Sequence, residues 1–196
     1  MSPTPGLRPD QLCLRPATPA DASAIAAVQT LSWAETYRGL MPDEFLTRMT
    51  GEVMRGRRVA QWEHTLASGP DSVSSPDLVM VAEQGGGVVA FASAGATRLH
   101  TVIPGDYDAE LFTLYALKSV HGVGLGRRLI SATAAALHAQ GFVGLAVWVL
   151  DVNPTRAFYR HLGGQELGRK TEDVPGGVLT EVALGWRDLT LLTETL

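Results

Sequence analysis

The chain has 196 residues, a formal net charge of −4 at pH 7 and a hydrophobic fraction of 45%. This length suits one α/β domain or at most two small ones, and the apolar fraction excludes a disordered chain. Without a surplus of basic residues there is little charge to neutralise a phosphate backbone, so we expect no nucleic-acid partner. The single cysteine, Cys13, excludes an internal disulfide and any CxxC metal or redox site.

Residues 1–10 contain three prolines and no apolar run, so they predict a flexible tail rather than a signal peptide. No uncharged apolar stretch reaches the roughly 18 residues that a membrane span requires, so we expect no membrane partner and a cytoplasmic protein. Four histidines lack metal-ligand spacing and are interpreted as surface residues: His64, His100, His138 and His161. We therefore expect no metal.

The first half of the chain predicts one strand, two helices and a β-hairpin. In order these are a strand at 12–15, helices at 20–36 and 52–66, and hairpin strands at 78–83 and 88–94. The three glycines at 85–87 supply the positive φ angles that the hairpin turn needs. Two segments rich in turn residues, 68–77 and 100–108, are interpreted as surface loops.

The second half predicts alternating strands and helices. A strand at 110–117 is mostly apolar on both faces, as is typical of the middle of a sheet. It is followed by a glycine turn, a helix to about 140, a strand at 145–150, a helix at 153–162, and strands near 165–171 and 179–186. Asn153 suits the N-cap of its helix and Pro154 the first helical position. A mixed sheet with helices on both faces accounts for this order.

The most informative segment is the turn at 121–128, which joins the central strand to a helix. Glycines at 122, 124 and 126 let the backbone curl and present its N–H groups, and the helix N-terminus adds partial positive charge. This combination favours a phosphate or pyrophosphate, although the turn could serve only to close a strand–helix corner. Arg127-Arg128 after the last glycine excludes a Walker A loop, and the GxGxG spacing excludes the GxGxxG dinucleotide fingerprint.

Residues 114–129 resemble the acetyl-coenzyme A site of the GCN5-related N-acetyltransferases, whose signature is Arg/Gln-x-x-Gly-x-Gly/Ala after a strand. His121, Gly124 and Gly126 hold the signature places, although histidine departs from the usual Arg or Gln. Residues 153–164 are similar to the family's Asn…Phe-Tyr-x-x-Leu-Gly-Gly helix. Residues 33–43 resemble a segment of one bacterial branch, and the whole resemblance spans roughly residues 12–188.

The resemblance implies one domain at 11–190 with a mixed, mostly antiparallel sheet of six or seven strands. It also implies direct transfer, in a ternary complex, of an acetyl group from acetyl-CoA to a primary amine of a small molecule or peptide. Glu110 is the candidate base, with Asp106 and Asp108 as substitutes, and Tyr159 is the candidate acid. Trp33 and Tyr37 are assigned to the acceptor side. The implied cofactor-binding residues are Tyr115, Ala116, Leu117, His121, Gly122, Val123, Gly124, Leu125, Gly126, Arg127, Asn153 and Arg156.

Several assignments have a purely structural alternative. Glu110 could be a solvent-facing charge at a strand start, Tyr159 could pack with the core residue Phe158, and Asn153 could only cap its helix. At the level of function, the alternatives are a catalytically silent protein that binds or senses an acyl-CoA, and an acyltransferase for longer acyl groups. The sequence leaves a homodimer open.

Overall fold

The computed structural model describes residues 12–67, 78–98 and 102–193, and seven strands of these residues form one sheet in the order β1-β2-β3-β4-β5-β7-β6. The strands are β1 (Leu12–Pro16), β2 (Leu78–Gln84), β3 (Gly87–Ala96), β4 (Ala109–Ala116), β5 (Leu145–Leu150), β6 (Gln165–Val174) and β7 (Gly177–Trp186). The helices are α1 (Ala22–Thr36), α2 (Asp43–Thr50), α3 (Glu52–Ala67), α4 (Leu125–Ala139), α5 (Thr155–His161) and α6 (Thr190–Thr193), with short 3-10 turns η2 (Pro19–Asp21) and η3 (Lys118–Val120).

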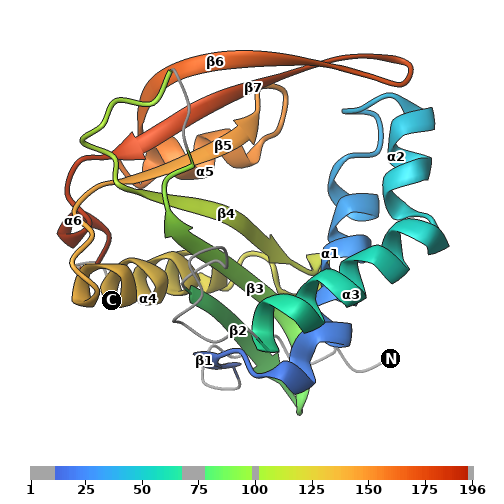
Figure 1. Ribbon diagram of the computed structural model, residues 1–196, viewed down its shortest axis with the longest axis horizontal. Helices are drawn as coiled ribbons and strands as arrows, with labels where there is room; N and C mark the ends of the chain where they lie inside the picture. Colours follow the sequence, from blue (N-terminus) through green and yellow to red (C-terminus); the bar gives the residue numbers. More distant parts are fainter. Residues whose placement is uncertain (1–11, 68–77, 99–101, 194–196) are drawn as a thin grey trace, which may run out of the picture.

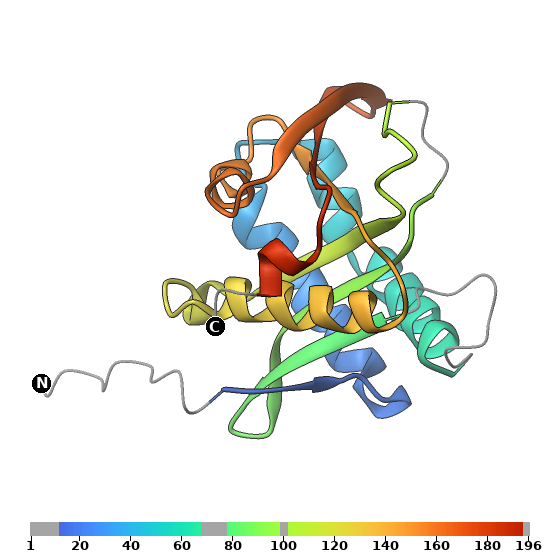
Figure 2. The same cartoon turned by 90° about the vertical axis from the view of Figure 1, so that its left-hand side faces the viewer.

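Helices cover both faces of the sheet because its strands alternate apolar side chains between the two faces. On one face Val79, Val81 and Phe91 pack against α1 and α3. On the other face the alanines of β2 and β3 pack against α4 (Figures 1 and 2). The small alanines let α4 lie close to the sheet, and the mixed, mostly antiparallel sheet of the prediction is confirmed.

The central pair β4 and β5 is the one parallel pair among the described strands, and it is short. Only Ala109, Glu110 and Leu111 pair with β5, opposite Leu145 to Val147, after which the two strands diverge (Figure 1). A β-bulge accompanies the divergence, since Ser93 pairs with Thr113 while Ala94 pairs with Leu111, which leaves Phe112 as the extra residue. The sheet therefore opens in its middle.

The β6–β7 hairpin extends past the rest of the sheet toward α2 (Figure 1). Its tip rests on the turn before α2: a Cβ atom built at Gly176 or Gly177 would lie 3.0 or 3.2 Å from the Pro42 ring. Gly176 also has a positive φ of 86°. Glycine at the tip thus satisfies both the turn and the close contact with Pro42.

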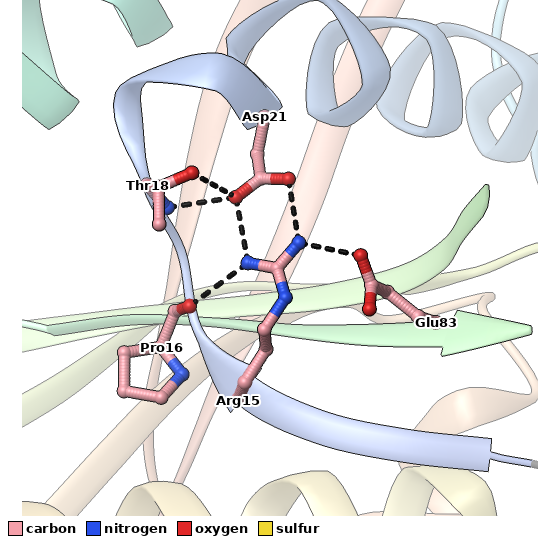
Figure 3. A network of polar contacts seen from close by, with 5 residues as sticks. All are labelled: Arg15, Pro16, Thr18, Asp21 and Glu83. Atoms are coloured by element: carbon pink, nitrogen blue, oxygen red, sulfur yellow. Dashed lines mark hydrogen bonds and ion pairs between the residues drawn. The ribbon is translucent and has the colours of Figure 1, made fainter. Parts of the chain in front are cut away.

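An ion-pair network fixes the first strand to the first helical turn (Figure 3). The Arg15 guanidinium donates to both carboxylate oxygens of Asp21 at 2.8 Å and to Glu83 of β2 at 2.5 Å. The Asp21 carboxylate also accepts the Thr18 N–H at 2.7 Å. These bonds to the charged form, led by the Arg15 bond, hold the pKa of Asp21 well below its usual range.

Most predicted elements are present within one to three residues of their predicted bounds. Three differences stand out: α2 and α6 were not predicted, and the first helix starts with the 3-10 turn η2 before α1. Asn153 lies one residue before the assigned cap, Pro154, yet its Oδ1 accepts the Thr155 N–H at 2.9 Å, so its capping role is confirmed.

The predicted tail at 1–10, the loop at 68–77 and His100 lie outside the described residues. Within the described ranges, no helix combines the length and the apolar character that crossing a membrane requires.

Candidate active site

A cavity of about 770 Å³ occupies the space where β4 and β5 diverge. Its walls come from α1, β4, the glycine turn, β5, α5 and the β6–β7 hairpin. Most of the predicted site residues line it: Trp33, Tyr37, Glu110, Tyr115, Ala116, His121, Gly122, Gly124, Leu125, Gly126, Arg127, Asn153 and Tyr159. The divergence of two neighbouring strands therefore brings together residues from distant parts of the chain.

The glycine turn forms one end of the cavity. Gly122 and Gly124 have φ values of 79° and 77°, and a Cβ built on either would point into open space. The first main-chain hydrogen bond into α4 is donated by Arg128 to the Gly124 carbonyl, so the preceding N–H groups of the helix start have no intrahelical acceptor. Donors of this kind at the positive end of a helix fit a phosphate or pyrophosphate.

Gly126 serves a different purpose from the other two glycines. A Cβ at this position would lie 3.3 Å from the Phe158 ring, so glycine lets the ring approach the first turn of α4. Phe158 also packs against the main core and lines the cavity. The assignment of Phe158 to the core is therefore confirmed in part, since its ring also forms a wall of the cavity.

His121 is held by the main chain at the end of β4. Its Nε2 lies 2.9 Å from the Ala116 carbonyl oxygen, which closes the short loop between β4 and the glycine turn. The side chain is exposed and lines the cavity. Because Nε2 contacts this carbonyl, we expect an anion at this end of the cavity to be bound by the main-chain N–H groups and by Arg127.

Glu110 lies at the opposite end of the cavity and is only 1% exposed, so the alternative of a solvent-facing charge is wrong. Its carboxylate forms an ion pair with Arg98 and also accepts the Arg98 main-chain N–H at 3.2 Å. The two substitutes lie outside the cavity lining. Asp108 accepts main-chain N–H groups of Val143 and Gly144, and Asp106 pairs with Arg187.

Tyr159 projects from α5 into the cavity, with its ring 5.4 Å from Phe158 and 6.2 Å from Trp186, centroid to centroid. Burial raises the pKa of its hydroxyl, and the neighbouring hydroxyl of Tyr115 adds to the effect. Tyr159 therefore keeps its proton throughout the neutral range. A protonated phenol in this place is able to donate a hydrogen bond or a proton to a leaving group.

A chain of polar contacts crosses the middle of the cavity. The Trp33 indole N–H donates to the Tyr115 hydroxyl at 2.8 Å, and the Tyr37 hydroxyl interacts with the side chains of Tyr115 and Asn153. Burial raises the pKa of both tyrosines, so both are neutral donors. Arg58 stacks on Trp33, with Cζ 5.2 Å from the ring centroid. The chain links α1 to β4 and to the start of α5.

Three of the predicted cofactor residues do not line the cavity. Leu117 packs into the cores on both faces of the sheet, and its N–H donates to the Val89 carbonyl at 3.0 Å. Val123 packs against the main core. Arg156 forms an ion pair with Asp151, so its guanidinium is held by a neighbour rather than turned into the cavity. The side chains of these three residues therefore do not support their assignment to the cofactor site.

The cavity also contains charged residues that were not predicted. Arg98 follows β3, and Lys170, Glu172 and Glu181 come from the β6–β7 hairpin. The sequence did contain a signal for the hairpin residues. If residues are paired outward from the turn at 175–177, Lys170 lies opposite Glu181, as it does in the structure. No sequence signal placed that hairpin beside the cavity.

Comparison with known proteins agrees with this architecture. A family model described as FR47-like protein matches residues 88–174. The uncharacterized N-acetyltransferase YuaI of Bacillus subtilis is 30% identical over 90% of this chain and 93% of its own length.

Two solved structures share the fold. One is a GCN5-related N-acetyltransferase from Rhodopseudomonas palustris, with a TM-score of 0.66, 22% identity, and coverage of 88% of this chain and 93% of that chain. The other is YncA from Salmonella typhimurium, solved with its cofactor acetyl-CoA, with a TM-score of 0.63, 19% identity, and coverage of 91% and 94%.

The fold is thus that of the N-acetyltransferases to which these structures belong. The chain belongs to the GCN5-related N-acetyltransferase family, which confirms the resemblance found in its sequence.

Proposed function

We propose that this protein transfers the acetyl group of acetyl-CoA directly to a primary amine of a small molecule or peptide, with both substrates bound together. The observation that carries the proposal is that one cavity at the opening of the sheet has a phosphate-type cradle at one end and a buried carboxylate at the other. The YncA structure with acetyl-CoA supports the choice of acetyl donor.

At the donor end, the main-chain N–H groups at the start of α4, together with Arg127, would hold the pyrophosphate of coenzyme A. The thioester supplies an activated acetyl carbon. The unpaired edge of β4 beyond Leu111 provides main-chain groups for the arm that carries the thioester. Asn153, buried at the start of α5, would form a hydrogen bond to the same arm through its side-chain amide.

At the acceptor end, the amine must lose a proton before it can attack, because an alkyl ammonium has a pKa of about 10.4. Glu110 would accept this proton, directly or through water. Arg98, already paired with Glu110, would keep the carboxylate oriented toward the cavity. Tyr159 would donate its proton to the sulfur as the thiolate leaves.

A thiol-release assay with acetyl-CoA and a panel of amines, peptides and aminoglycosides tests the proposal. We expect free thiol and acetylated amine to appear in equal amounts with at least one acceptor. Binding of acetyl-CoA without any release would instead support the silent acyl-CoA binder, an alternative favoured by the ion pair that engages Glu110. Absence of acetyl-CoA binding would contradict both readings.

A further inference from the structure

The β6–β7 hairpin presents one face to the acceptor half of the cavity. Four side chains of this face line the cavity: Lys170, Glu172, Leu179 and Glu181. Lys170 lies opposite Glu181 and Glu172 opposite Leu179, and residues two apart on a strand share a face. The pairing register therefore sets all four toward the same space.

The position of this face is fixed by packing at the hairpin tip. Gly176 and Gly177 contact Pro42 so closely that a Cβ on either would lie within 3.2 Å of its ring. Because both ends of the hairpin are anchored, at the sheet and at Pro42, its charged face is held over the cavity.

Charges in the acceptor half do not balance. Lys170 Nζ lies 3.0 Å from Glu181 Oε2 and 4.2 Å from the centroid of the Trp148 ring. Arg98 is paired with Glu110, and its Cζ lies 4.6 Å from the centroid of the Phe112 ring. Both cations thus already have a carboxylate and an aromatic face.

Glu172 is the remaining charged group of this half, and among the described residues it has no ion pair. A second cation would be attracted to this carboxylate, whereas an anionic group would meet an excess of negative charge.

We infer that the acceptor is an amine with a second cationic centre, and that Glu172 binds this centre while the reacting nitrogen lies near Glu110. The inference rests on the proposed acetyl transfer and narrows its acceptor class. The second centre stays protonated at neutral pH, so the ion pair with Glu172 persists while the reacting nitrogen gives up its proton.

The test compares three acceptors of equal chain length in the thiol-release assay: a straight-chain diamine, the corresponding monoamine and the corresponding ω-amino acid. We expect kcat/KM to be about tenfold higher for the diamine than for the monoamine, the scale of one or two partly exposed cation contacts. The ω-amino acid should be the poorest acceptor. Added salt should reduce the diamine preference, because it screens the ion pair.

Two variants that should change the diamine preference in opposite directions distinguish binding by Glu172 from a folding defect. Glu172→Gln should lower the ratio of diamine to monoamine kcat/KM about fivefold. Lys170→Gln should raise the ratio, because it frees Glu181 for the second cation. Glu166→Gln is the matched control: Glu166 lies on β6, pairs with Arg169 and does not line the cavity, so the ratio should not change.

Equal kcat/KM for diamine and monoamine, or a preference for the ω-amino acid, would overturn the inference and leave the proposed function intact. Failure to acetylate any of the three would overturn the inference. If the protein also acetylates no other amine, the proposed function fails with it, and calorimetry with acetyl-CoA then separates a silent binder from a protein without a coenzyme A site.

Discussion

The donor and acceptor halves of the cavity are formed by different kinds of chemical group. The donor half relies on main-chain groups of β4 and of the turn at 122–127, whereas the acceptor half relies on side chains from α1, β4, β5 and the β6–β7 hairpin. A main-chain site depends on backbone geometry, so it is most sensitive to loss of glycine. A side-chain site depends on charge and hydrogen bonding, so it is most sensitive to changes that preserve shape but alter chemistry.

The largest effect should come from Gly124→Glu in the donor half. Gly124 has a φ of 77°, which disfavours any other residue, and a glutamate there would place negative charge beside the expected pyrophosphate. We expect calorimetry to detect no coenzyme A binding.

Gly86→Glu is the control, because Gly86 has a similar φ of 83° in the β2–β3 turn and does not line the cavity. Its coenzyme A affinity should equal that of the wild type. Normal affinity of Gly124→Glu would contradict the donor site.

The next largest effect should come from Tyr159→Phe, which removes a hydroxyl and keeps the ring. We expect acetyl transfer to slow by roughly 10- to 10⁴-fold, the scale of one acid–base group, with little change in coenzyme A affinity. Tyr107→Phe is the control, because Tyr107 is also buried but lies outside the cavity lining. Unchanged turnover in single-turnover kinetics would remove Tyr159 from the reaction.

Glu110→Gln should reduce kcat/KM by roughly 10²-fold near neutral pH, because the amine then lacks its proton acceptor. The deficit should shrink as pH rises toward about 10, where the free amine forms without help. Asp108→Asn, which alters a carboxylate that binds main-chain N–H groups outside the cavity, should leave the shape of this pH profile unchanged. A deficit that is constant across the pH range would argue against a base role for Glu110.

The smallest effect on the cavity should come from Asp21→Asn, at the edge of the sheet. We expect the free energy of unfolding at neutral pH to fall by about 2–3 kcal/mol, because the Arg15 network is broken, while coenzyme A affinity stays unchanged.

The pH dependence of this contribution has a defined sign. Since folding lowers the pKa of Asp21, its stabilisation is present above about pH 4 and declines as pH falls below that value. Chemical denaturation of wild type and variant across this range measures it. Equal loss of stability on acidification in both proteins would contradict the role of the network.

The donor half could be predicted from the sequence because its determinants are local. Three glycines between a strand and a helix predicted a tight turn before a helix start, and Gly122, Gly124 and Arg127 all line the cavity. Even there, side-chain contacts between residues only five positions apart were not predictable: Asp151 holds Arg156, and the Ala116 carbonyl holds the His121 ring.

The acceptor half was less predictable because distant segments meet there. Strand periodicity indicated the β6–β7 hairpin, but no local pattern showed that its tip would reach Pro42 and place Glu172 and Lys170 over the cavity. The same holds for Arg98, because the pairing of β3 with β4 brings the end of β3, and with it Arg98, close to Glu110.

An amide-resolved NMR titration with coenzyme A tests the central claim most directly, because that claim concerns main-chain N–H groups. We expect the largest chemical-shift changes at the amides of residues 122–127 and no change at the amides of the turn that contains Gly86. Saturable binding that leaves the amides of 122–127 unperturbed would contradict it.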